Sequence, residues 1–158
     1  MLRELQVIMG KPAVSSYKAG EETITTGMAV VKNETDKTFE FASAETAADL
    51  YFVDKERIPT GINAARENMS DYDADFTTLV EGDFGKLTNY LPGERFATDA
   101  YVETGIVAGV RLSANTAGKI VKAATTVASK YVCGGFYTDN GHKLVIVEVS
   151  DTADKNAS

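Results

Sequence analysis

The chain of 158 residues contains one histidine and one cysteine, the side chains best suited to nucleophilic catalysis or to binding a transition metal. A serine or cysteine nucleophile needs a base such as histidine, and zinc needs at least three protein ligands. His142 follows Asn140-Gly141 in a predicted turn, and Cys133 lies inside a predicted strand. We therefore expect a solvated turn residue and a small buried residue, in a protein that is not an enzyme and holds no cofactor or metal.

Two other segments match ligand-binding motifs only in part. The Asp-x-Asp-x-Asp run of residues 71–75 opens like a calcium loop, but Phe76 and Gly82 stand where that loop needs glycine and glutamate. Gly118-Lys119 matches the end of a phosphate-binding loop, whereas Ser113 replaces its first glycine. We expect a solvated acidic loop and an ordinary turn at these places.

The net charge of −7 is unevenly distributed along the chain. Residues 40–104 carry 14 acidic and 5 basic side chains, a charge of −9, and the remainder carries +2. A protein that binds a phosphate backbone needs a basic stripe, so direct binding of nucleic acid is not expected. No apolar run approaches the length of a membrane span, and we do not expect residues 1–4 to begin a signal peptide, because no sustained apolar stretch follows them. The single cysteine is typical of a chain made in a reducing cytoplasm.

Short β-branched runs separated by turn residues predict a mainly β fold, a small β-barrel or sandwich. The order of a Gly-Glu turn, a glycine before a β-branched run, and a lysine at the next strand occurs in residues 19–42 and again in residues 92–123. The fold is therefore a candidate for two related halves. The alternative is that an all-β chain simply uses the same turn chemistry twice.

We expect one β-rich domain over residues 1–150, whose strands would position any functional side chain. Asn140-Gly141 between two long apolar runs predicts a C-terminal β-hairpin, because Asn-Gly supplies the positive φ angles of a tight turn. Residues 54–86 form an irregular acidic excursion, and residues 151–158 are expected to be a flexible tail. The other expected strands cover residues 23–32, 37–42, 47–53, 94–97, 100–112 and 118–124.

The N-terminal segment, residues 1–17, is either a first strand or an arm whose apolar side chains are buried against a neighbouring molecule. Long excursions in compact domains often carry function, so residues 54–86 are a second place to seek a contact surface. The interface candidates from these two segments are Leu2, Leu5, Val7, Ile8, Met9, Ile58, Tyr72 and Phe76.

Residues 19–42 and 92–149 contain, in order, Gly-Glu, Thr-Gly-Met-Ala-Val-Val and Gly-Lys-Ile-Val-Lys-Ala. This order of segments resembles the sequences of the small β-rich proteins that decorate or cement tailed-bacteriophage capsids. The resemblance implies a non-enzymatic virion protein, made in the host cytoplasm, that binds the major capsid protein on the outer surface and stabilises the shell. The resemblance provides no catalytic residue to transfer. We also expect a homotrimer on the shell, because multivalent contacts strengthen binding and a symmetric lattice favours a symmetric oligomer.

Two other classes of function remain open. A tail-tube or head-completion subunit would use the same kind of surface in a ring. A small carbohydrate-binding module or enzyme would use the acidic loop to hold a ligand, although no aromatic-rich sugar platform accompanies that loop.

Overall fold

The computed structural model describes residues 1–8, 14, 16–20, 23–55 and 77–157. The described residues are mainly β, with almost no helix, as the sequence predicts. The strands are β1 (Leu2–Gln6), β2 (Lys18–Ala19), β3 (Ile24–Thr25), β4 (Ala29–Asn33), β5 (Thr38–Glu40), β6 (Tyr51–Asp54), β7 (Thr78–Leu79), β8 (Lys86–Thr88), β9 (Arg95–Thr98), β10 (Arg111–Ala114), β11 (Ile120–Lys122), β12 (Ser129–Asp139) and β13 (His142–Asp154).

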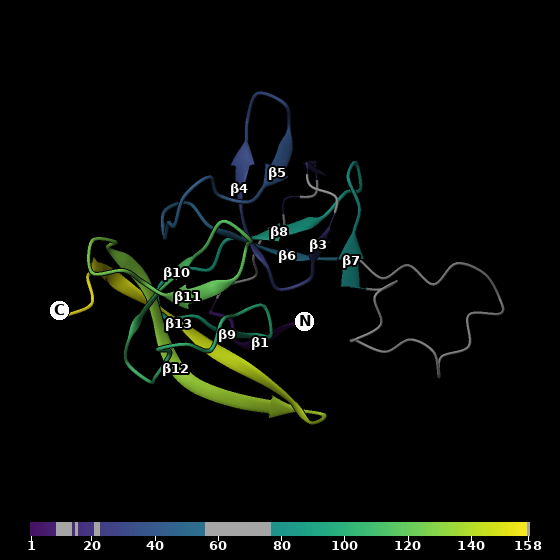
Figure 1. Cartoon of the computed structure of the whole chain (residues 1–158). Helices are drawn as coiled ribbons and strands as arrows, with labels where there is room; N and C mark the ends of the chain where they lie inside the picture. The colour runs from purple at the N-terminus through teal and green to yellow at the C-terminus, as the bar shows by residue number, and fades with distance from the viewer. Residues whose placement is uncertain (9–13, 15, 21–22, 56–76, 158) are drawn as a thin grey trace.

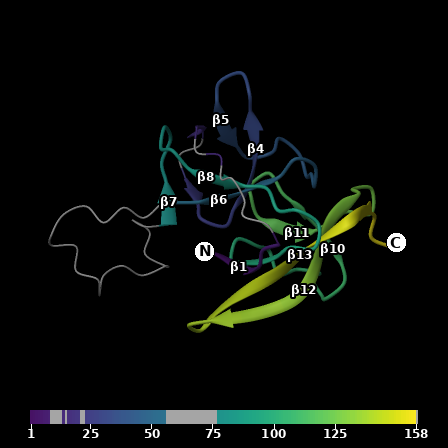
Figure 2. The same ribbon diagram turned by 180° about the vertical axis from the view of Figure 1, so that it is seen from behind.

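The strands form a curled six-stranded sheet in the order β1-β9-β13-β12-β10-β11 and a five-stranded sheet in the order β2-β5-β4-β6-β8. A small sheet pairs β3 with β7. Figure 1 shows the six-stranded sheet in the lower half and the β4–β5 hairpin protruding at the top, and Figure 2 shows the same arrangement from behind.

The predicted C-terminal hairpin is confirmed. The strands β12 and β13 pair around Asn140 and Gly141, whose φ angles are 48° and 82°. A bulge between Cys133 and Gly135 shifts the register and increases the local twist. The hairpin forms the centre of the larger sheet and extends beyond it at the lower right of Figure 1.

The largest core cluster contains buried side chains from both larger sheets. Four aromatic rings lie at its centre: Phe52 contacts Phe96, Tyr90 and Tyr131, with ring centroids 4.3, 5.7 and 5.8 Å away. A second cluster around Phe39 fills the inside of the five-stranded sheet. The apolar runs of the sequence thus hold the two sheets together by burial.

Tyr131 combines a well-packed ring with a poorly placed hydroxyl. Its hydroxyl is buried and has no hydrogen-bond partner among the described residues. Burial, and then the nearby Asp49 and Tyr51, raise the pKa of this phenol above its usual value. Because an unsatisfied buried hydroxyl costs roughly 1–3 kcal/mol, we expect Tyr131→Phe to increase the free energy of unfolding by about 1 kcal/mol in urea titrations.

Tyr90→Phe is the matched control, because the Tyr90 hydroxyl donates to Glu4 Oε1 at 3.4 Å. That change removes a hydrogen bond and should give no gain in stability. A loss of stability in Tyr131→Phe as large as that in Tyr90→Phe would show that the Tyr131 hydroxyl is satisfied in solution.

The expected strand over residues 100–112 is wrong for most of its length. The structure places turns there, with Gly105 at φ 74° and Gly109 at φ 88°, and β10 begins only at Arg111. These two glycines adopt left-handed backbone angles, which interrupt the extended conformation that a strand needs. In the same way, Gly27 at φ 94° divides the expected strand 23–32 into β3 and β4.

Two other boundaries differ from those expected. The strand expected over residues 47–53 begins only at Tyr51, because Asp49 adopts a left-handed φ of 51°. The tail expected to be flexible from residue 151 instead continues β13 to Asp154, opposite Ser129. The side chain of Asn156 then donates to the backbone oxygens of Arg111 and Ala123.

The two segments of similar sequence each form one antiparallel hairpin, β4–β5 and β10–β11. These hairpins belong to different sheets, and the strands before them have different partners: β3 pairs with β7, whereas β9 pairs with β1 and β13. The likeness of the halves therefore extends over a hairpin, and a common origin stays a prediction.

Candidate functional site

The first candidate site is the outer edge of β1. This strand lies at one end of the six-stranded sheet, and β9 is its one partner strand within the described residues. Leu2 lies opposite Thr98, and a bulge falls between Glu4 and Gln6. The amino nitrogen of Met1 donates to the Thr26 oxygen at 2.7 Å and also contacts the Asp99 carboxylate. The strand is therefore held at its start and along one side.

The outermost strands of the two larger sheets differ in how their free sides are covered. The free side of β2 is met by residues 82–84, that of β8 by Val14, and that of β11 by residues 100–102. Within the described part of the chain, no such backbone pairing covers the free side of β1. An exposed strand edge is a template for pairing with another chain unless it is protected.

Exposed apolar side chains lie on β1, just after its end and on the turn before β9. Leu5, Val7 and Ile8 are 41%, 40% and 59% exposed, and Leu91 beside them is 47% exposed. We call these four residues the β1 edge patch. Leu2, by contrast, packs against the main core. Of the other predicted interface residues, Met9, Ile58, Tyr72 and Phe76 lie outside the described residues.

Glu94 orients the end of this edge and was not singled out from the sequence. Its side chain is fully buried, and its carboxylate accepts hydrogen bonds from the Leu91 backbone nitrogen at 2.6 Å and from the Ile8 nitrogen at 3.3 Å. It therefore joins the turn before β9 to the residue that follows β1. The signal was present in the sequence, since Glu94 belongs to the repeated Gly-Glu turn.

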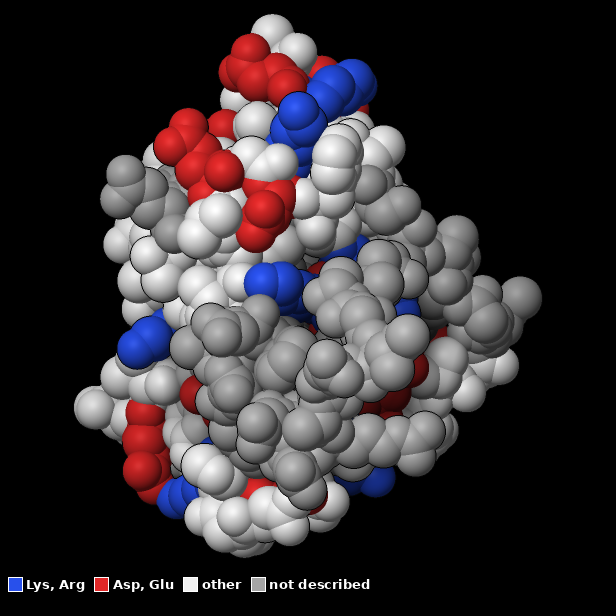
Figure 3. Space-filling view, turned by 90° about the vertical axis from the view of Figure 1, so that its right-hand side faces the viewer, with Lys and Arg blue, Asp and Glu red and all other residues white. Residues whose placement is uncertain are grey.

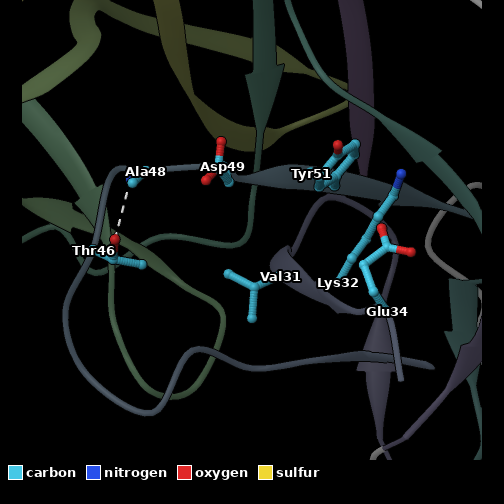
Figure 4. Close-up of a pocket in the computed structure, with 7 residues that line it drawn as sticks. All are labelled: Val31, Lys32, Glu34, Thr46, Ala48, Asp49 and Tyr51. Atoms are coloured by element: carbon cyan, nitrogen blue, oxygen red, sulfur yellow. Dashed lines mark hydrogen bonds between the residues drawn. The ribbon is translucent and has the colours of Figure 1, made fainter. Parts of the chain in front are cut away.

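The second candidate site is a surface hollow of about 370 Å³ beside β4. It arises because β6 pairs with β4 at Ala29 and Val30, and among the described residues no strand pairs with the rest of β4, up to Asn33, on that side. The chain before β6 does not continue along β4; instead, Thr46 pairs with Ala114 of β10. The hollow is lined by Val31, Lys32, Glu34, Thr46, Ala48, Asp49 and Tyr51, which Figure 4 shows.

No protein-family model, curated protein or solved structure matches this chain.

Charged and aromatic side chains surround one end of the hollow. The ammonium of Lys32 lies 4.1 Å from the ring centre of Tyr51 and 4.8 Å from that of Tyr17. The Tyr17 hydroxyl donates to the Glu34 carboxylate, which also binds the Lys37 ammonium at 3.0 Å. These hydrogen bonds lower the pKa of Glu34 and raise that of Tyr17. Figure 3 shows charged side chains gathered at the top, where the β4–β5 hairpin protrudes.

The structure places the reactive residues apart from both sites. Cys133 is buried in β12, where burial raises the pKa of its thiol above the usual value. His142 is exposed next to the turn of the hairpin. Within the described residues, no group of three or more His, Cys, Asp or Glu side chains could hold a metal ion, and no helix is long and apolar enough to span a membrane. The acidic run of residues 71–75 lies outside that part.

Proposed function

We propose that this chain is a structural protein of a tailed-phage virion that binds the outer surface of the capsid and stabilises the shell without catalysing a reaction. The resemblance of its sequence to capsid decoration proteins supports the class of function. The observation that carries the proposal is the β1 edge patch on an outer strand that, among the described residues, has no covering segment.

The β1 edge suits docking onto another protein for two reasons. Burial of a large apolar side chain contributes roughly 1.5–3 kcal/mol, so Leu5, Val7 and Ile8 together offer useful binding energy. The free side of a strand also offers backbone hydrogen bonds to an added segment. In this proposal the partner is the major capsid protein, and the protein is made in the host cytoplasm and resides on the capsid surface.

A homotrimer on the shell is part of the proposal. Several weak contacts held together raise the effective concentration at each site by orders of magnitude, and a symmetric lattice favours a symmetric oligomer. The free protein need not be a trimer, because the lattice itself arranges the copies.

The proposal is tested by co-sedimentation of the purified protein with emptied capsids of the phage that encodes it. We expect saturable binding that Leu5→Lys combined with Ile8→Lys weakens by roughly tenfold or more, because two apolar contacts are replaced by charges. The matched control is Val80→Lys combined with Val107→Lys, two side chains that are 56% and 59% exposed elsewhere on the surface. Absence of binding, or equal weakening by both pairs, would contradict the proposal.

A further inference from the structure

The hollow beside β4 is lined by Lys32, whose ammonium group is a cationic hydrogen-bond donor. Lys32 is held between the rings of Tyr17 and Tyr51, at 4.8 and 4.1 Å, an arrangement that fixes the position of an ammonium group. Among the described residues it has no ion pair and donates no side-chain hydrogen bond. Glu34, the nearest carboxylate in the hollow, is already bound by Tyr17 and Lys37.

The hollow also contains a hydrogen-bond acceptor, the carboxylate of Asp49. Asp49 lines the hollow from the chain before β6, and its carboxylate likewise has no ion-pair or hydrogen-bond partner among the described residues. Figure 4 shows Val31 and Tyr51 between the two charged groups, while Ala48 lies on the far side of Asp49; these side chains give the hollow an apolar part. The donor and the acceptor thus come from two separate stretches of chain, β4 and the segment that leads into β6, and both stretches contribute apolar surface.

The charges of the hollow restrict the class of ligand. Glu34 and Asp49 repel an anion, and Lys32 repels a cation, so an ion of either sign meets one unfavourable group. A neutral ring that carries several hydroxyls can accept from Lys32, donate to Asp49 and lay a C–H face on Val31 or Tyr51. A volume of about 370 Å³ lies at the small end of the range for ligand pockets.

We infer that this hollow is a binding site for a neutral saccharide, with Asp49 and Lys32 as its polar contacts. The inference does not depend on the proposed role on the capsid, because it uses a different surface: the β1 edge patch lies on the six-stranded sheet and the hollow on the five-stranded sheet.

The test is an NMR titration of the isotopically labelled protein with the methyl glycosides of glucose, galactose, mannose and N-acetylglucosamine. We expect at least one glycoside to cause saturable shifts at residues 31–34 and 46–51. Asp49→Asn should weaken that binding by roughly tenfold, because a hydrogen bond to a charged acceptor becomes one to a neutral acceptor. Asparagine also tolerates the left-handed backbone at this position, so the variant should fold.

Lys32→Met is the second variant, since methionine keeps much of the side-chain length without the ammonium group, and it should weaken binding in the same way. Asp36→Asn and Lys155→Met are matched controls, because both side chains are exposed and neither lines the hollow. No saturable shift with any glycoside, equal effects of site and control variants, or stronger binding of glycylglycine than of every glycoside would overturn the inference.

Discussion

Gly27→Ala is expected to destabilise the protein by about 3 kcal/mol or more. Gly27 has a φ of 94°, and a β-carbon added there would lie 2.5 Å from the Met1 carbonyl oxygen and in collision with the Thr98 hydroxyl. The Thr98 hydroxyl is itself fixed, because it donates to the Gly27 oxygen at 2.9 Å. Backbone atoms must therefore move, and β1, which begins next to Met1, would lose its anchor.

Gly82→Ala separates the two causes of this loss. Gly82 has a similar φ of 89° but nothing lies within 4 Å of an added β-carbon, so it shares the backbone strain without the collision. We expect a loss of about 1–2 kcal/mol for Gly82→Ala in urea titrations. Equal losses at Gly27 and Gly82 would show that β1 is not packed against the turn before β4.

Phe52→Ala is expected to cost about 3–5 kcal/mol of unfolding free energy. The ring is fully buried and contacts Phe96, Tyr90 and Tyr131, so its removal leaves a cavity between the two larger sheets. Phe84→Ala is the matched control, since Phe84 is 60% exposed and should change stability by less than about 1 kcal/mol. A small loss at Phe52 in the same titration would mean that the sheets do not share this core.

The sequence predicts local features of this fold well where a few neighbouring residues determine the geometry. Asn140-Gly141 has the chemistry of a tight turn, and the apolar runs on both sides give the long hairpin. The mainly β class follows from the same patterns. The expected strand over residues 100–112 is wrong because Gly105 and Gly109 turn the chain, although the segment is largely apolar.

Features that depend on distant pairing could not be predicted in this way. Residues 151–154 are polar and resemble a tail, yet β13 continues through them because the start of β12 lies alongside. The hollow joins Lys32 to Asp49 only because β6 stops pairing with β4 at Val30. Nothing in the local sequence of either residue indicates the other.

The candidate interface was predicted in part. The apolar character of residues 2–8 indicated a contact segment, but the pattern alone could not separate Leu2, which faces the core, from Leu5 and Ile8, which are exposed. That division follows from pairing with β9 and from the bulge after Glu4. The covering of β2, β8 and β11, which makes β1 distinctive, depends on contacts between distant segments.

We propose that the β1 edge docks on a capsid, and a cryo-electron microscopy map of emptied capsids saturated with the protein would test this. We expect three copies around a local symmetry axis, each with Leu5, Val7 and Ile8 against density of the major capsid protein. A map in which the β1 edge faces solvent, or in which no copy binds the shell, would contradict it.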